Sequence, residues 1–224
     1  MDYGKDFKKF AMSDYNVSSS KMDYFEKQIE GSLTPYILEE REMRATQIDI
    51  FSRLMRDRIL WVAGPVNDNM STIVQAQLMY LDSADTLPIT MHIDSPGGSV
   101  KSGLSMVDVM DYIKSDIRTI NTGMAASMGS VLLGAGTKGK RGSLRFSQTM
   151  LHQSSGGAVG NIQDAEISMI EWRKVNNILF ELLGGYCGKS AEQVKNDASR
   201  DLWLDAEQAL SYGIIDEIVG KKKK

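Results

Sequence analysis

The chain has 224 residues, 42% apolar and 25% charged, a balance typical of one globular domain with an appendage. The formal net charge of -3 gives no overall basic field, so nucleic acid is not an expected partner. The single cysteine, Cys187, excludes an intrachain disulfide and predicts a structural thiol in a reducing compartment, and no ligand spacing predicts a metal site.

Residues 1–31 are polar and show no sustained amphipathic period, so they are interpreted as an N-terminal extension. Their acidic residues, and the lack of an apolar targeting segment among them, favour a cytoplasmic protein. The main domain is expected over residues 32–220, and the lysines at 221–224 are interpreted as a solvated tail.

Helical and extended patterns alternate along the first part of this domain. Apolar residues at helical spacing predict helices over 48–55, 70–81 and 100–110, and a further helix from about Ser127. Apolar or alternating runs predict strands at 58–64, 89–94, 117–122 and 145–151. Strands that alternate with helices indicate βαβ crossovers, and therefore a largely parallel sheet covered by helices.

One long helix is predicted from Asn161 to Leu183, with apolar residues on more than one face. A helix that packs on a single core needs only one apolar stripe, so part of this helix is expected to contact another chain. Shorter helices near 191–196 and 205–212 and a strand at 214–219 are expected to complete the domain.

The segment GMAASMGSVLLGAG, from Gly123 to Gly136, lies in an uncharged window whose length raises the question of a membrane span. Glycine, serine, threonine and asparagine fill much of this window, which argues against a span. Ser127 then has two interpretations. Its side chain caps the backbone N–H groups of the following helix, or it is a nucleophile.

Ligands of an open α/β sheet bind at the carboxyl ends of its strands, where three of the predicted loops lie. The first loop contains Gly97 and Gly98, which either form an ordinary turn after Pro96 or let a backbone N–H approach a developing oxyanion. These glycines do not form a GxGxxG motif, so a dinucleotide site has little support.

The other two loops carry Ser127 and His152. A serine nucleophile needs a base, and His152 is favoured over His92 because His92 lies inside a predicted strand. A carboxylate is also needed to orient the imidazole, and spacing alone leaves several candidates open. These are Asp164, Asp197, Asp201, Asp205 and Asp216. The order Ser, His, Asp differs from that of chymotrypsin, subtilisin and the α/β-hydrolases, so a triad here needs another fold.

Six motifs stand out along the chain: GPVND (64–68), SPGGSV (95–100), GMAASMGS (123–130), GTKGKR (136–141), MLHQSSGG (150–157) and RDLWLDAEQALSYGIID (200–216). In this order they resemble the ClpP family of self-compartmentalised serine peptidases, over residues 32–219. The resemblance implies an α/β fold, a crotonase-like superhelix of repeated βαβ units, with a protruding handle helix after Asn161. It also implies Ser127 as nucleophile, His152 as base, Asp201 as the orienting acid, and the N–H groups of Gly98 and Met128 as the oxyanion hole.

The same resemblance implies that Gly97, Gly156 and Gly157 bind substrate, whose extended main chain lies against residues 156–160. It further implies two stacked heptameric rings around a chamber, supplied with unfolded proteins by an AAA+ unfoldase of the ClpX or ClpA/ClpC kind. The chain has no Walker motif, so ATP is expected to act on that partner, and no cofactor is expected here. Residues 1–31 resemble a propeptide, with cleavage expected between about Glu30 and Leu33.

Three residues depart from the family's pattern. Ser154 stands where the family commonly has proline, and this change is expected to loosen the loop behind the base. Ser199 replaces an acidic residue before Arg200, which puts an ion pair between rings in doubt. His92 occupies a position usually held by tyrosine, in the hydrophobic cleft that receives the unfoldase.

Two other functions stay open at this point. A crotonase-type enzyme acting on acyl-CoA shares the fold and the oxyanion chemistry, but it needs no Ser, His and Asp set. A catalytically silent ring subunit is the alternative that is not an enzyme, although all three triad residues are present in this chain.

Overall fold

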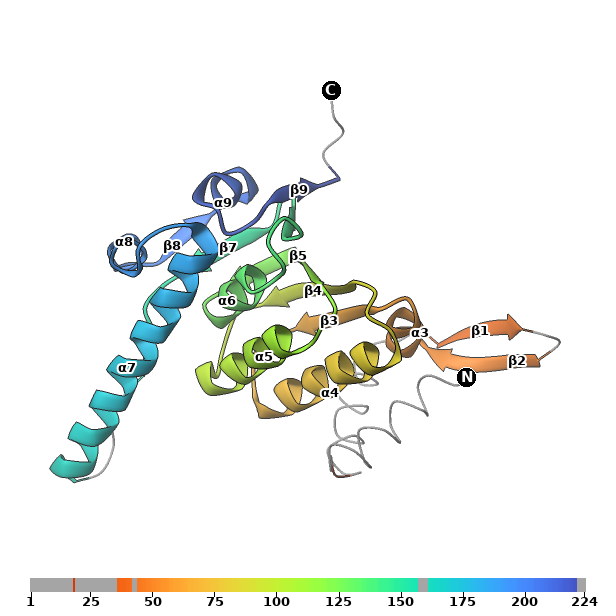
Figure 1. The fold of residues 1–224 in the computed structure, drawn as a ribbon, viewed down its shortest axis with the longest axis horizontal. Coiled ribbons are helices and arrows are strands. Elements are labelled where there is room, and N and C mark those ends of the chain that lie inside the picture. Colours follow the sequence, from red (N-terminus) through yellow and green to blue (C-terminus); the bar gives the residue numbers. More distant parts are fainter. Residues whose placement is uncertain (1–17, 19–35, 42–43, 157–160, 221–224) are drawn as a thin grey trace.

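The computed structural model describes residues 18, 36–41, 44–156 and 161–220. The expected extension over 1–31, its cleavage site and the lysine tail therefore lie outside the described residues, apart from Ser18. A seven-stranded sheet forms the centre of the molecule, with helices packed against it (Figure 1).

The order of the strands brings several strand ends together. Five strands are parallel neighbours in the order β3 (Ile59–Ala63), β4 (Ile89–Ser95), β5 (Ile117–Ala126), β6 (Gly142–Leu144) and β9 (Glu217–Val219). The last three residues of β5, Met124 to Ala126, pair instead with β7 (Gln148–Leu151), also in parallel. Strand β7 in turn pairs with β8 (Leu202–Leu204) in antiparallel orientation. Because β5 and β7 end at the same level, the residues that follow them meet at one edge of the sheet.

Two amphipathic helices, α4 (Asp68–Ala84) and α5 (Val100–Tyr112), lie side by side next to the sheet (Figure 1). Each helix begins directly after a strand-end loop, because Asn67 and Ser99 accept hydrogen bonds from the first free backbone N–H groups. Their inward faces join the strands in one core, which includes Leu78, Met91, Ile93, Met106 and Val107.

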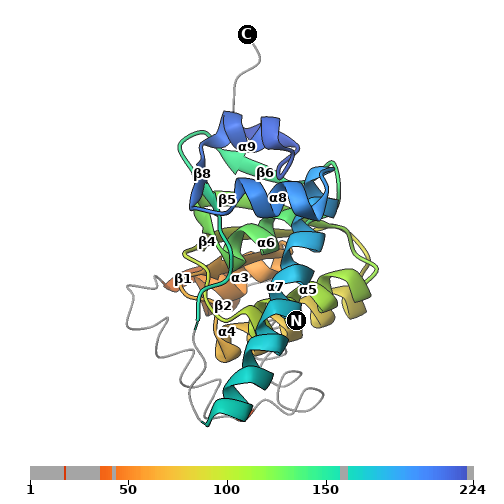
Figure 2. The ribbon, with the colours of Figure 1, turned by 90° about the vertical axis from the view of Figure 1, so that its left-hand side faces the viewer.

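The second half of the chain packs around the short buried helix α6 (Met128–Gly134). Helix α7 (Ile162–Cys187) is followed by α8 (Ala191–Asp197) and α9 (Ala206–Tyr212), which lie beside β8 (Figures 1 and 2). The C-terminal half of α7 buries Leu179, Phe180 and Leu183 against the core, whereas its N-terminal half projects away from the domain. On that projecting half, Ile162, Ile167 and Ile170 are 78%, 61% and 63% exposed.

The predicted α/β class, the βαβ crossovers and the protruding helix are confirmed. The predicted helices at 70–81 and 100–110 and the strands at 58–64 and 89–94 match α4, α5, β3 and β4. The predicted short helices after Cys187 match α8 and α9. Cys187 itself is buried, and burial raises the pKa of its thiol to about 11, as expected of a structural cysteine.

Several predicted boundaries are wrong. The helix expected over 48–55 begins only at Ile50, as α3 (Ile50–Arg56), because Ile48 belongs to strand β2 (Arg44–Asp49) and Asp49 caps the helix. Strand β5 continues four residues beyond Thr122, and α7 continues to Cys187 rather than ending at Leu183. The last strand begins at Glu217, where its pairing with β6 begins, and the buried Ile214 and Ile215 precede it.

Four strands were not expected. The antiparallel hairpin of β1 (Tyr36–Arg41) and β2 lies apart from the sheet, on the side opposite α7 in Figure 1. The single strand expected over 145–151 is instead β7 alone, preceded by β6 and by an exposed Phe146, and β8 follows Asp201. Within the described ranges, none of the helices has both the length and the hydrophobicity of a membrane span.

Candidate active site

Ser127 stands at the sharp turn between β5 and α6, with φ 54° and ψ -122°. A positive φ is uncommon for a residue with a side chain, and the surrounding structure must hold it in place. The backbone supplies that hold, because the Ser127 N–H donates to the Met150 carbonyl at 2.9 Å while the Ser127 carbonyl accepts from Ser130. The turn lifts the Ser127 side chain out of the regular strand and helix directions.

The hydroxyl of Ser127 does not cap α6, since it makes no hydrogen bond to the helix N-terminus. Its Oγ instead lies 2.8 Å from Nε2 of His152. His152 directly follows β7, so the parallel pairing of β5 with β7 brings the two side chains together from 25 residues apart. Of the two interpretations of Ser127, the structure favours the nucleophile.

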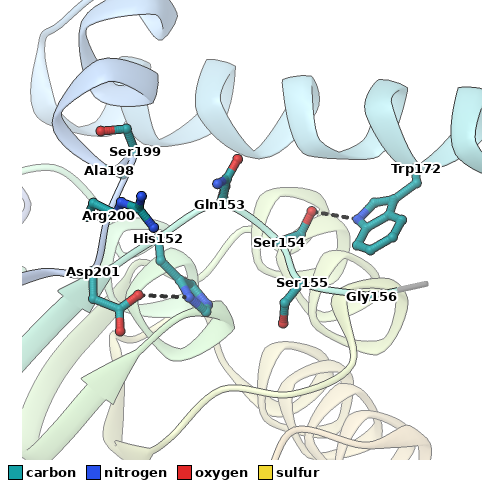
Figure 3. Close-up of a pocket in the computed structure, with 10 residues that line it drawn as sticks. All are labelled: His152, Gln153, Ser154, Ser155, Gly156, Trp172, Ala198, Ser199, Arg200 and Asp201. Atoms are coloured by element: carbon teal, nitrogen blue, oxygen red, sulfur yellow. Dashed lines mark hydrogen bonds and ion pairs between the residues drawn. The ribbon is translucent and has the colours of Figure 1, made fainter.

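The other imidazole nitrogen of His152 faces Asp201, with Nδ1 3.5 Å from Oδ1 (Figure 3). This is an ion-pair distance rather than a short hydrogen bond, and catalytic contacts of this kind tighten when substrate binds. The other four candidate aspartates have different partners. Asp164 contacts Asn161, Asp197 accepts from Tyr212, Asp205 caps α9 and Asp216 pairs with Arg141.

Gly97 and Gly98 form the floor beside the serine. Gly97 has φ +90°, and a Cβ on it would lie 2.6 Å from the Cβ of Ser127. Gly98 has φ +147°, and a Cβ on it would collide with the carbonyl of Val66, to which this segment is bonded on both sides. Both positions therefore require glycine, so these residues form more than an ordinary turn after Pro96.

Two backbone donors are left available next to Ser127. The Met128 N–H is the first of α6, and neither it nor the Gly98 N–H donates to an acceptor within the described part of the chain. The Met128 side chain is buried, where it packs on Gly103 of α5 and anchors the helix start. These two N–H groups, one at the N-terminus of α6 and one in the loop after β4, can stabilise an oxyanion that forms on a carbonyl attacked by Ser127.

A pocket of about 770 Å³ opens on the other side of His152, between the loop after β7, the residues before β8 and helix α7 (Figure 3). Its walls include Gly156, Trp172 and Asp201. Gly156, a predicted substrate-binding residue, thus lies beside the site, whereas Gly157 lies outside the described residues. No group of three or more metal-ligating side chains occurs among the residues that the structure describes.

The three departures have distinct surroundings. The imidazole of His92 is half-buried and stacks on the Trp61 ring, with a 4.8 Å centroid distance. Arg200 and Ser199 are exposed, and Arg200 makes no ion pair within this described chain. Ser154, which is expected to loosen its loop, is hydrogen-bonded to both Trp172 and Asn176 of α7.

A serine on a strained turn, a histidine within hydrogen-bond distance, a carboxylate behind it and two free N–H groups are the arrangement of a serine hydrolase. The sheet of βαβ crossovers that carries them is not that of an α/β-hydrolase, because the triad order differs. Comparison with known proteins gives the family. The sequence model of the Clp protease family matches residues 40–222, so the chain belongs to this family of peptidases.

Relatives with assigned names are similar to nearly the whole chain. A protein of Bacteroides fragilis is 46% identical over 218 residues, which cover 97% of this chain and 99% of that protein. Proteins of Porphyromonas gingivalis and Bacteroides thetaiotaomicron are 44% and 45% identical, over 98% and 97% of this chain and 99% of each relative. All three carry the name ATP-dependent Clp protease proteolytic subunit.

Proposed function

We propose that this chain is the proteolytic subunit of an ATP-dependent Clp protease, with Ser127, His152 and Asp201 as its catalytic triad. The observation that carries the proposal is the 2.8 Å contact between Ser127 Oγ and His152 Nε2 at the junction of β5, β7 and α6. The family match and the names of the relatives support peptide-bond hydrolysis over acyl-CoA chemistry or a silent ring subunit.

The reaction begins when Nε2 of His152 takes the proton of Ser127 and Oγ attacks the carbonyl carbon of the peptide bond. The negative charge that develops on the carbonyl oxygen is stabilised by the N–H groups of Gly98 and Met128. His152 then gives the proton to the leaving amine, which leaves an acyl group on Ser127. Water, deprotonated by His152, hydrolyses that ester, and Asp201 stabilises the imidazolium in each half of the reaction.

Main-chain groups near Gly97, Gly156 and Gly157 bind the substrate. They can form hydrogen bonds with the main chain of an extended peptide of almost any sequence. Such a peptidase needs enclosure, and we infer two stacked heptameric rings around a chamber. The exposed isoleucines on the projecting half of α7 support contact with another subunit.

Unfolded proteins enter with the help of an AAA+ unfoldase of the ClpX or ClpA/ClpC kind. That partner uses the ATP, so this chain needs no cofactor. The single cysteine, Cys187, is a free buried thiol, which supports a reducing compartment such as the cytoplasm as the place where this protein acts.

A serine-reactive fluorophosphonate tests the proposal. The Ser127 Oγ is expected to displace fluoride from phosphorus, so each chain gains one phosphonyl group, located on the peptide that contains Ser127. Hydrolysis of a short fluorogenic peptide is expected to fall in proportion to the labelled fraction. Full hydrolysis by completely labelled protein would contradict the mechanism, and acyl-CoA turnover without peptide hydrolysis would favour the crotonase-type alternative.

His92 predicts a pH dependence of unfoldase docking. Burial, and then the nearby charge of Arg118, lower the pKa of His92 below its ordinary value, so the imidazole is neutral at pH 7. It gains a proton only as the pH falls through that lowered pKa. A charge in a cleft that an apolar unfoldase loop covers is unfavourable, so unfoldase affinity is expected to be lower at a pH below that lowered pKa than at pH 7.5.

The measurement compares unfoldase affinity at the two pH values for wild type and for His92→Tyr. The variant retains an aromatic ring against Trp61 but has no group that gains a charge in this range. Its affinity is therefore expected to change less with pH. The same pH dependence in both proteins would show that another group is responsible.

A further inference from the structure

The loop that links the base to the substrate-binding segment is tied to α7 through one serine. Ser154 lies two residues after His152 and two residues before Gly156. Its backbone N–H donates to Oδ1 of Asn176 at 2.9 Å, and its Oγ lies 2.8 Å from the same oxygen. The indole Nε1–H of Trp172 donates to Ser154 Oγ at 2.7 Å (Figure 3).

The chemistry of the three residues fixes the direction of every one of these bonds. An indole N–H can only donate, so Ser154 Oγ accepts from Trp172 and its own hydrogen is free to go to Asn176. The Asn176 oxygen must face Ser154, because a backbone N–H can bond only to an acceptor. A proline at this position would have neither the N–H nor the hydroxyl.

The loop has few other restraints. Gln153, Ser155 and Gly156 make no hydrogen bond to any residue that the structure describes. Gly156 instead packs on the Trp172 ring, where a Cβ would lie 2.5 Å from the ring atoms. Trp172 thus holds the loop twice, through its N–H at Ser154 and through its ring at Gly156.

His152 is held differently. Its imidazole has its own partners, Ser127 on one side and Asp201 on the other. Loss of the bonds at Ser154 is therefore expected to change the position of the main chain around Gly156, and to change the position of the imidazole that activates Ser127 much less.

We propose that Ser154, Trp172 and Asn176 are positioning residues that hold the substrate-binding main chain at Gly156 against α7 and so set the affinity for extended peptides. The inference rests on the proposed peptidase function. It adds that residues of α7, outside the triad, determine how well the enzyme binds its substrate.

Removing these bonds is expected to raise KM without lowering kcat. In Ser154→Ala, which loses the hydroxyl and both of its bonds, KM for an extended peptide is expected to rise about tenfold or more, the effect of two hydrogen bonds. Trp172→Phe loses the N–H and the outer ring atoms that pack on Gly156, so its KM is expected to rise about fivefold or more. Asn176→Ala removes the acceptor for two donors, and its KM is expected to rise about tenfold or more.

The experiment measures KM, kcat and the rate at which fluorophosphonate labels Ser127, all on the assembled full-length protein. Labelling needs an activated Ser127 but no extended peptide, so its rate is expected to stay within about twofold of wild type. The matched controls are Ser168→Ala and Asn177→Ala, exposed positions on α7, and neither is expected to change KM. The double variant Ser154→Ala/Trp172→Phe is expected to raise KM by less than the product of the two single effects, because both changes remove the bond between Trp172 and Ser154.

Each result has a definite meaning. A raised KM with unchanged kcat and labelling in the three single variants supports the inference. Unchanged KM in Ser154→Ala and Trp172→Phe overturns it, and so does an equal fall of kcat and labelling, which would indicate disruption of the triad instead. Wild-type protein that neither labels at Ser127 nor hydrolyses peptides would overturn the proposed function itself.

Discussion

Ser127→Ala is expected to lower the rate of peptide hydrolysis by a factor of about 10⁴ or more, while the protein keeps its fold. The hydroxyl is the atom that forms the acyl intermediate, and it makes no hydrogen bond that supports α6. Its loss therefore removes the reaction without removing a structural contact. The measurement is steady-state hydrolysis of a fluorogenic peptide, together with circular dichroism and native mass to check the fold and assembly.

Ser83→Ala serves as the control, because Ser83 is exposed at the end of α4 and bonds only to a carbonyl of its own helix. It is expected to retain wild-type activity. His152→Ala should cost about as much as Ser127→Ala, and the double variant should cost no more than either, because the two residues act as a unit. A pure Ser127→Ala preparation that retains most of the activity would contradict the proposed nucleophile.

The elements that could be predicted are those with a long, one-sided apolar pattern. In α4 and β4, apolar residues recur at the helical or alternating period and end at clear turn signals, so sequence alone locates them. The end of β5 could not be located in this way, because Gly123, Ala125 and Ala126 have small side chains and the segment has no alternating pattern. It is a strand because β7 pairs with Met124 to Ala126 and β4 pairs with Ala125.

The site residues also differ in whether the local sequence indicates them. Ser127 and His152 could be selected as candidates from the residues alone, because each follows a predicted strand and the chain has only two histidines. Asp201 could not be chosen over four other aspartates without the family resemblance, since β8, which brings it to His152, is only three residues long. The bonds of Ser154 to α7 had no local signal, because they join residues 18 and 22 positions apart.

A second contact without a local signal predicts the largest loss of stability. Arg141 is 1% exposed, and its guanidinium and backbone bind the Asp216 carboxylate through three bonds, the shortest 2.6 Å. The guanidinium also donates to the carbonyls of Tyr186 and Gly213, at the end of α7 and after α9. One side chain therefore joins the start of β6 to both C-terminal segments, across 75 residues of sequence.

Arg141→Met is expected to lower the free energy of unfolding by about 3 kcal/mol or more, because it leaves a carboxylate with little solvent and no counter-charge. The measurement is urea denaturation of wild type and variant at the same protein concentration, since assembly adds to the apparent stability. Arg141→Met/Asp216→Leu is expected to recover part of the loss, because no unpaired charge is then left, although the carbonyls of Tyr186 and Gly213 still have no donor.

Lys140→Met is the matched control, because Lys140 is the neighbouring cation and its pair with Asp116 is exposed to solvent. It should have little effect on the free energy of unfolding.

The pH dependence of the free energy of unfolding gives a second check. Burial alone would raise the pKa of Asp216, but the bonds from Arg141 and the Gly139 N–H together lower it below its ordinary value. A lowered folded-state pKa stabilises the protein above the unfolded value, near 3.9, and this contribution is lost as the pH falls through the folded-state pKa. The difference between wild type and Arg141→Met should therefore be full at neutral pH and shrink below about pH 4, and a difference that does not change with pH would show that the lost packing of Arg141, rather than its charge, sets the cost.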